Sequence, residues 1–166
     1  RTFSSAASDV YKRQRLMPYT KYIPKPMVKI NGKPILEIVI SNIAKSGLKN
    51  IYLSVNHFKE QIIDYFGDGS KLGLNIKYLI EETPLGTAGS LKLLPRSINK
   101  PVLVINGDVL TNLNPSHLLN FHNDHNSTAT LCVREEKIHV PFGVVETKGT
   151  ELFSFQEKPC FYKLVN

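Results

Sequence analysis

Short apolar segments alternate with amphipathic segments along most of this chain, and this alternation limits the possible folds more than any other feature. The apolar segments are rich in aliphatic residues and predict strands at 51–55, 76–80 and 102–105. The amphipathic segments predict helices at 35–46, 58–66 and 115–123, with another helix after Gly89. Strands and helices that alternate at this spacing indicate an α/β fold with a mostly parallel sheet, covered by helices on both faces.

The helix at 35–46 has the clearest pattern of these elements. Pro34 stands where a first helical position tolerates proline, and Gly47 is a typical helix stop. The apolar residues recur at helical spacing and form one face that we expect to be buried, namely Leu36, Val39, Ile40 and Ile43. Among the strands, 102–105 is continuously apolar, as is typical of a strand buried on both faces. Further short strands are expected at 128–133, 143–145 and 152–155.

The composition is that of a single globular domain. The chain has 166 residues, of which 42% are apolar and 21% charged. Its longest uninterrupted aliphatic run, at 102–105, is far shorter than the roughly 20 apolar residues of a membrane helix. Cys132 and Cys160 offer no CxxC spacing and no disulfide framework, as expected in a reducing compartment. We therefore expect a cytoplasmic protein that does not span a membrane.

The first 14 residues stand apart from the rest of the chain. Residues 9–14, DVYKRQ, resemble the translated read-through of a sequencing adapter, so 1–14 are expected to be non-native and are excluded from the fold prediction. Residues 15–166 are expected to form a partial domain that is truncated at both ends. The formal charge is +7, and removing three basic residues and one acidic residue with this segment leaves +5. Prolines exclude a helix at 15–33, which predicts an extended basic loop.

The glycine-rich motifs exclude the common phosphate-binding loops. Residues 67–73, GDGSKLG, follow a predicted helix and lack GxGxxG spacing, so they indicate a helix stop and a turn. The GxxxxGKS/T motif of P-loop NTPases does not occur in the sequence. The segment 85–90, LGTAGS, lies between a predicted strand and a helix, where small residues let backbone amides approach a ligand. The alternative is a tight turn that only connects the two elements.

Carboxylates follow two of the predicted strands. Glu81 and Glu82 end one strand, and Asp108 follows another. Ligands of open α/β sheets bind beyond the carboxyl ends of strands, so Asp108 is well placed to bind Mg²⁺ together with a substrate phosphate. The alternatives are a turn or cap carboxylate for Asp108 and solvated side chains for the two glutamates. A metal site made of histidines is disfavoured by the spacing of His117, His122 and His125.

Taken in order, the motifs resemble those of the sugar-1-phosphate nucleotidyltransferases. The pieces that carry the resemblance lie between residues 15 and 159 and are RLMPYT, PKPMVKINGKPILE, LSVNH, YFGDGS, EETPLGTAGSL, VLVINGD, PFGVVE and FQEKP. The resemblance implies a Rossmann-like, glycosyltransferase-A-like core. It also implies an enzyme that transfers a nucleoside monophosphate from an NTP to a sugar 1-phosphate with Mg²⁺. The family's glycine-rich stretch before Arg15 is missing, and the second metal-binding aspartate would lie beyond Asn166, so we expect this fragment to be inactive.

The resemblance further implies roles for individual residues. The residues matched to the phosphates and the metal are Arg15, Lys25 and Asp108, those matched to base and ribose are Gly86, Thr87 and Gly89, and those matched to the sugar-phosphate pocket are Gly143, Glu157 and Lys158. Cations suit this role, because two anionic substrates repel each other unless positive charge screens them. The wording of KPMVKINGKPILE and VPFGVV is most similar to a branch that carries regulatory CBS domains and activates amino sugars.

Guanine is the expected base. Glu81 stands five residues before Gly86, where relatives that read uracil or thymine often carry an amide. An ionised carboxylate offers two acceptors to the adjacent N1–H and 2-amino donors of guanine. The alternative is that Glu81 points to solvent while Glu82 or backbone groups read the base.

Two other classes of function are alternatives. A non-catalytic nucleotide or sugar-nucleotide sensor can share this fold, although a sensor has no need of the metal carboxylate. A nucleic-acid binder is disfavoured, because the positive charge is concentrated in one proline-rich loop with few aromatic residues. The expected partners are an NTP and a sugar 1-phosphate, without nucleic acid or membrane, and a homo-oligomer stays open.

Overall fold

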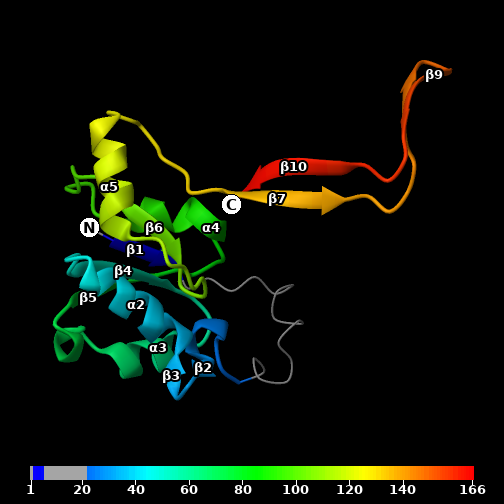
Figure 1. Ribbon diagram of the computed structural model, residues 1–166. Coiled ribbons are helices and arrows are strands. Elements are labelled where there is room, and N and C mark those ends of the chain that lie inside the picture. Colours follow the sequence, from blue (N-terminus) through cyan, green and yellow to red (C-terminus); the bar gives the residue numbers. More distant parts are fainter. Residues whose placement is uncertain (1, 6–21) are drawn as a thin grey trace. The chain divides into compact units, whose positions relative to one another are not determined.

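The computed structural model describes residues 2–5 and 22–166, and the chain divides into two compact units (Figure 1). Unit 1 ends at His125, and unit 2 contains residues 126–166. Length and composition alone predicted one domain, and the boundary stretch HNDHNST contains neither the proline nor the glycine that would indicate a linker. Within the described residues, no helix has the length and apolar character needed to cross a membrane.

Unit 1 is built on a four-stranded sheet in the order β5-β4-β1-β6. The strands are β1 (Thr2–Ser5), β4 (Asn50–Val55), β5 (Asn75–Ile80) and β6 (Leu103–Asn106). All neighbouring strands run parallel, as predicted for an α/β fold. Their carboxyl ends therefore lie along one edge of the sheet, which we call the carboxyl edge.

One face of this sheet carries the main core. The helices α2 (Ile35–Lys45) and α3 (Lys59–Phe66) bury their apolar residues there against Ile51, Leu53 and Val55 of β4. These three strand residues are fully buried and alternate along β4, so one face of the strand meets both helices. Truncation of such an aliphatic side chain to alanine would cost about 2 to 5 kcal/mol.

The opposite face is covered by a shorter segment. Tyr52 of β4 and Leu79 of β5 are buried there against η5 (Ser90–Leu93) and the residues Leu94, Ile98 and Val102 that follow it. Both faces of the sheet are therefore covered, which confirms the predicted layer arrangement.

The helix boundaries follow the sequence signals closely. All four residues predicted for the buried face of α2 are buried, and Pro34 precedes its first turn. α3 ends at Gly67, whose φ of +54° is in the region that favours glycine. α5 (Pro115–Asp124) begins after Asn114, whose side chain accepts a hydrogen bond from the backbone N–H of Ser116 at 2.9 Å.

Thr2–Ser5, which belong to the segment excluded from the fold prediction, form a strand in the structure. These residues form β1 at the centre of the sheet, where Thr2 lies opposite both Ile51 of β4 and Leu103 of β6. A strand in this position gives hydrogen-bond partners to the facing backbone groups of both neighbours, which would otherwise be left without them. The other residues of this segment lie outside the described part of the chain.

Two other predictions for unit 1 need correction. The helix expected after Gly89 starts earlier, as α4 (Gly86–Gly89), and continues only as the 3₁₀ turn η5. Val104 of β6 is 40% exposed, so this strand is not buried on both faces within the described structure. β6 is the edge strand of the described sheet, so fewer neighbouring residues cover its side chains.

The described part of the basic loop at 15–33 is more ordered than expected. It contains η3 (Lys25–Met27) and a hairpin of β2 (Lys29–Ile30) and β3 (Lys33–Pro34). Asn31 and Gly32 form the hairpin turn with φ of +50° and +82°, the combination that favours Asn-Gly. The Asn-Gly pair was the sequence signal that identifies this hairpin.

Unit 2 consists of strands without a buried core. β7 (Arg134–His139) pairs with β10 (Cys160–Val165), and β8 (Val144–Lys148) pairs with β9 (Glu151–Gln156), both antiparallel. No side chain between 126 and 166 is buried, and Phe153 is 71% exposed. The strand predicted at 128–133 is wrong, because the β-branched residues there precede the strand, and the charged segment REEKIH forms β7 instead.

Candidate active site

Two carboxylates lie at the carboxyl edge of the sheet in unit 1. Glu81 directly follows β5, and Asp108 stands two residues beyond the end of β6. Because ligands of open α/β sheets bind at this edge, the structure gives both residues the position that the sequence predicted. Their surroundings differ strongly.

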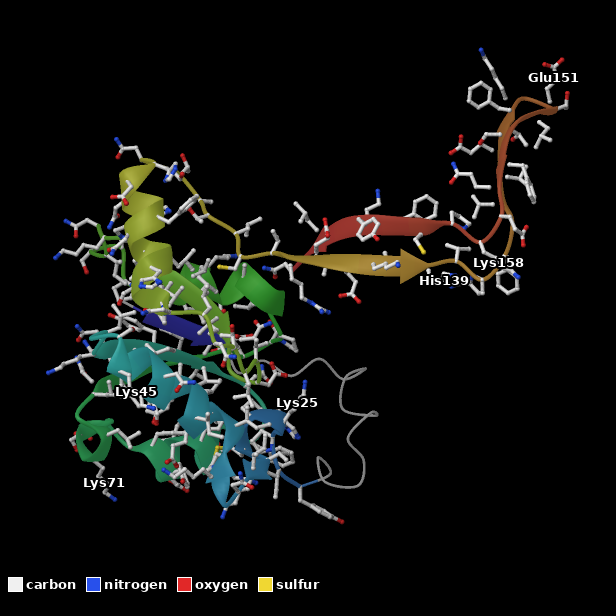
Figure 2. All side chains as sticks on the ribbon, in the orientation of Figure 1. Lys25, Lys45, Lys71, His139, Glu151 and Lys158 are labelled. Atoms are coloured by element: carbon white, nitrogen blue, oxygen red, sulfur yellow. The ribbon has the colours of Figure 1, made fainter. Side chains whose placement is uncertain are left out.

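Asp108 forms an ion pair with Lys25. Its Oδ2 lies 2.5 Å from the Lys25 Nζ, and both side chains are partly exposed, at 22% and 24%. Lys25 opens η3, which is anchored because the next two residues, Pro26 and Met27, are buried. Figure 2 shows Lys25 at the opposite end of the unit from Lys45 and Lys71. The structure thus brings a cation and a candidate metal ligand into contact, although they are far apart in the sequence.

Glu81 is held inside the protein. It is 4% exposed, its Oε1 accepts a hydrogen bond from the Ser54 hydroxyl, and its Oε2 accepts one from the Leu85 N–H at 3.0 Å. The Asn56 side chain donates to the Glu81 backbone carbonyl at 2.8 Å. The alternative in which Glu81 points to solvent is therefore wrong.

The matched glycines form a tight turn directly after this cluster. Gly86, Thr87 and Gly89 lie in the single-turn helix α4. Gly86 has φ of +77°, where a side chain would be strained, and a Cβ on Gly89 would approach the Cβ of Leu85 to 2.9 Å. Backbone conformation favours glycine at 86 and close contact favours it at 89, and Glu81 accepts from the N–H of Leu85, the residue just before the turn.

The residues matched to a sugar-phosphate pocket lie together in unit 2. A Cβ on Gly143 would lie 2.8 Å from the Phe155 ring and 3.3 Å from Oε2 of Glu157. The Lys158 Nζ lies 3.9 Å from Oε1 of Glu157, and both side chains are mostly exposed. Figure 2 shows Lys158 near His139, the last residue of β7. The residues that follow these two form a backbone hydrogen bond, in which the Val140 N–H donates to the Pro159 carbonyl at 3.0 Å. Both charged groups are therefore available to a ligand.

The donor set fits one kind of metal site. Among the described residues, no group of three or more histidine, cysteine, aspartate or glutamate side chains could hold a metal ion. A closed protein cage is therefore not formed by these residues. The single carboxylate of Asp108 fits Mg²⁺, which favours one or two carboxylates together with substrate phosphates and water.

Arg15, the other residue matched to the phosphates, lies outside the described residues. The roles of Ser54 and Asn56 were missed by the sequence analysis. The available signal was the pair of polar residues at the end of an otherwise apolar strand, in the motif LSVNH.

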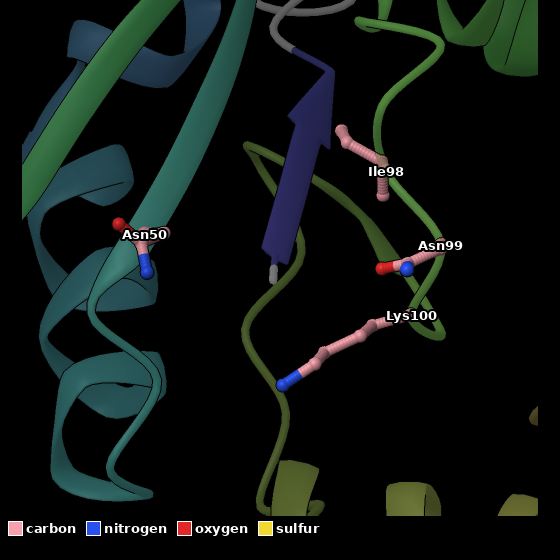
Figure 3. Close-up of a pocket in the computed structure, with 4 residues that line it drawn as sticks. All are labelled: Asn50, Ile98, Asn99 and Lys100. Carbon is pink, nitrogen blue, oxygen red and sulfur yellow. The ribbon is translucent and has the colours of Figure 1, made fainter.

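A pocket at the other edge of the sheet is separate from this site. It is lined by Asn50, Ile98, Asn99 and Lys100, and Asn50 begins β4, whereas the candidate site lies at the strand's carboxyl end (Figure 3). The Asn50 side-chain carbonyl already accepts a hydrogen bond from Asn75 at 3.0 Å. This pocket therefore has no part in the site described above.

The sequence matches known proteins over most of its length. A family model described as nucleotidyl transferase matches residues 12–166. The chain is 36% identical over 149 residues to mannose-1-phosphate guanylyltransferase of Mycobacterium tuberculosis, covering 89% of this chain and 42% of that protein. It is 37% identical over 146 residues to D-glycero-alpha-D-manno-heptose 1-phosphate guanylyltransferase of Campylobacter jejuni, covering 87% of this chain and 63% of that protein.

Relatives with a different base are also similar. The chain is 31% identical over 164 residues to UTP--glucose-1-phosphate uridylyltransferase of Synechocystis sp., covering 90% of this chain and 42% of that protein. The chain therefore spans from about two fifths to three fifths of the length of these relatives.

The fold agrees with these matches. The structure is similar to that of HddC from Yersinia pseudotuberculosis complexed with GMP-PN, with a TM-score of 0.65 and 24% identity, covering 99% of this chain and 72% of that chain. The predicted nucleotidyltransferase-type α/β fold is confirmed by this similarity. The family predicted from the ordered motifs is confirmed as well, and the chain belongs to the nucleotidyl transferase family.

Proposed function

We propose that the protein transfers a nucleoside monophosphate from an NTP to a sugar 1-phosphate and releases pyrophosphate. An oxygen of the sugar phosphate attacks the α-phosphorus, and a new P–O bond forms. The bond from the α-phosphorus to the oxygen that bridges to the β-phosphate breaks, and its electron pair leaves with pyrophosphate. No protein nucleophile is needed, so the protein positions two anions and stabilises the leaving group.

The contact between Lys25 and Asp108 is the observation that carries this proposal. It joins a cation and a carboxylate at the carboxyl edge, and both groups remain partly exposed to an incoming ligand. When a substrate binds, the Lys25 ammonium group can pair with a phosphate oxygen, and the Asp108 carboxylate that it leaves can bind another cation. Lys25 would then hold the phosphates. Arg15 is proposed as a second phosphate contact from the motif match alone.

Mg²⁺ is the proposed cofactor, and Asp108 is the residue that would hold it together with substrate phosphate oxygens. When bound, the ion neutralises negative charge on the approaching phosphates. The chain itself would contribute the Asp108 carboxylate as a metal ligand and the Lys25 ammonium group beside it.

GTP is the proposed nucleotide. Two of the relatives compared above are named guanylyltransferases and one is named a uridylyltransferase. Glu81 lies where β5 meets α4, and its carboxylate offers acceptors to the N1–H and 2-amino group of guanine. The backbone of Gly86, Thr87 and Gly89 would lie against base and ribose.

The sugar 1-phosphate is proposed to bind at Gly143, Glu157 and Lys158. A carboxylate accepts hydrogen bonds from sugar hydroxyls, and a lysine ammonium group binds phosphate as a point charge. The exposed position of both charged side chains supports this role. An amino-sugar 1-phosphate is the first candidate, because the motif wording resembles the branch that activates amino sugars.

The test is a panel of NTPs and sugar 1-phosphates with pyrophosphate release as the readout. It is made with a protein of the relatives' full length that contains these residues, and with the 166-residue chain alone. We expect turnover with GTP and one class of sugar 1-phosphate for the longer protein and little turnover for the chain alone. Nucleotide binding without pyrophosphate release by the longer protein would favour a sensor and contradict the proposal.

A further inference from the structure

Ser54 is a small polar residue within the mostly apolar strand β4. It is fully buried, and its position in β4 is opposite Leu79 of β5. A buried hydroxyl costs free energy unless it has a hydrogen-bond partner. Its partner is the Oε1 of Glu81, which lies 27 residues later in the sequence. This contact links β4 to Glu81, which lies between the end of β5 and α4.

The two oxygens of Glu81 have different partners. Oε2 accepts from the Leu85 N–H at 3.0 Å, and Oε1 accepts from the Ser54 hydroxyl. A backbone N–H can only donate, whereas a hydroxyl can donate or accept. The Leu85 N–H can therefore pair only with an oxygen of residue 81. The Ser54 hydroxyl can pair with either an oxygen or an NH₂ group of that residue.

We propose that Ser54 is a positioning residue that sets the base preference through Glu81; this inference rests on the proposed nucleotide transfer. The two internal hydrogen bonds hold the carboxylate in one orientation at the start of α4. Each oxygen uses one acceptor site internally and keeps one for a ligand. Two acceptors presented side by side match the two adjacent donors of guanine.

The same contacts predict what an amide would present at position 81. In Glu81→Gln, the Leu85 N–H requires the amide oxygen, so the NH₂ group faces Ser54, whose hydroxyl then accepts. One amide hydrogen and one oxygen acceptor site remain for the base. A donor beside an acceptor matches uracil or thymine, so the hydroxyl of Ser54 permits either side chain and orients each of them.

The test compares Ser54→Ala with Ser54→Thr, which keeps the hydroxyl, and with Ser54→Cys, which keeps the volume but donates weakly. Dissociation constants for GTP, ITP and UTP are measured by calorimetry, because binding does not depend on turnover. ITP lacks the 2-amino group. The same ratios are then taken from kcat/KM in a protein of the relatives' length, and thermal unfolding is followed for every variant.

We expect Ser54→Ala to lower the preference for GTP over UTP about tenfold, the size of effect expected for a hydrogen bond to a charged group. Preference for GTP over ITP should fall with it, Ser54→Cys should show the same direction, and Ser54→Thr should stay within about threefold of the unaltered protein. A uniform loss for all three nucleotides in Ser54→Ala and Ser54→Cys would reveal a purely structural role and overturn the inference.

The two proposals fail in different ways. An unaltered protein that prefers GTP in binding but releases no pyrophosphate contradicts the proposed transfer, whereas the binding ratios still decide the role of Ser54. An unaltered protein that binds GTP and UTP equally, or binds neither, overturns the role of Ser54 in base preference.

Discussion

The two carboxylates at the carboxyl edge of unit 1 have opposite surroundings. Glu81 is almost completely buried, and both of its oxygens accept hydrogen bonds from neutral groups of the protein. Asp108 is partly exposed, and the contact that the structure gives it is a lysine ammonium group that is itself partly exposed. The first carboxylate is built into the fold, whereas the second can change partners.

This difference in surroundings suits the two carboxylates to different tasks, base recognition for Glu81 and metal binding for Asp108. A carboxylate held by internal donors keeps one orientation, which suits the recognition of a base by directional hydrogen bonds. A carboxylate paired with a partly exposed cation can release that cation to a phosphate and accept a metal ion, because an ion pair that water reaches is weaker than a buried one. The comparison predicts that substitutions at the two positions affect different measurements.

The largest effect is expected at Asp108. Asp108→Asn keeps the shape and removes the charge, so turnover with Mg²⁺ should fall about 100-fold or more, as for other losses of charge stabilisation in such sites. The measurement is pyrophosphate release at saturating Mg²⁺ in a protein of the relatives' length. Retained activity would mean that Asp108 is not a metal ligand. The free energy of unfolding, measured in parallel, should be unchanged.

Substitution of Glu81 should lower the free energy of unfolding more than substitution of Asp108, the reverse of the order expected for turnover. Glu81→Ala leaves the Ser54 hydroxyl and the Leu85 N–H without their acceptor, so the free energy of unfolding should fall by about 2 to 4 kcal/mol. Asp108→Ala breaks a single, partly exposed ion pair and should cost about 1 kcal/mol. Urea unfolding of both variants measures the difference. Equal losses would contradict the distinction between a built-in and an exchangeable carboxylate.

A smaller effect is expected when the charge at position 81 is removed but the shape is kept. In Glu81→Gln the preference for GTP over UTP should fall about tenfold, because one acceptor becomes a donor. Binding of both nucleotides by calorimetry gives the ratio. A preference that is unchanged by the substitution would mean that another group reads the base.

The smallest effect is expected at a carboxylate outside the site, which serves as a reference. The Tyr65 hydroxyl donates to Glu37 at 2.6 Å and, with Lys33, holds the pKa of Glu37 below its ordinary value. Tyr65→Phe should lower the free energy of unfolding by about 0.5 to 1 kcal/mol at neutral pH.

The pH dependence of this contribution has a definite sign. Because the folded pKa of Glu37 lies below the unfolded one, the stabilisation is present above the ordinary carboxyl pKa and disappears as the pH falls through the lowered value. The difference between Tyr65→Phe and the unaltered chain should therefore shrink in acid. A difference that grows in acid would contradict this assignment, and nucleotide preference should not respond to the substitution.

Helices with a complete set of signals were predictable from the sequence. α2 has a proline before it, a glycine after it and one apolar face, and the structure buries that face as expected. The strand expected at 128–133 failed, because its β-branched residues match a strand locally, whereas the strand forms where β10 offers a partner. β1 was missed, because the adapter-like motif at 9–14 led to the exclusion of the whole segment 1–14, and the place of Thr2–Ser5 depends on pairing with the two strands beside it.

The sequence proposes the members of the candidate site but not the contacts between them. The motif order identified Lys25, Glu81 and Asp108, yet no local pattern reveals that Lys25 meets Asp108 or that Ser54 meets Glu81. These pairs depend on strand order in the sheet, which brings together segments that are distant in sequence. Whether Glu81 would be solvated or buried was likewise decided by the hydroxyl of a neighbouring strand.

The most direct test of the account follows the phosphorus atoms. A protein of the relatives' length that contains these residues is incubated with a sugar 1-phosphate, Mg²⁺ and GTP labelled either at the α-phosphorus or at the γ-phosphorus. We expect the α-label in the sugar nucleotide and the γ-label in pyrophosphate, in equal amounts. The γ-label in orthophosphate or on the sugar, or bound GTP that stays intact, would contradict it.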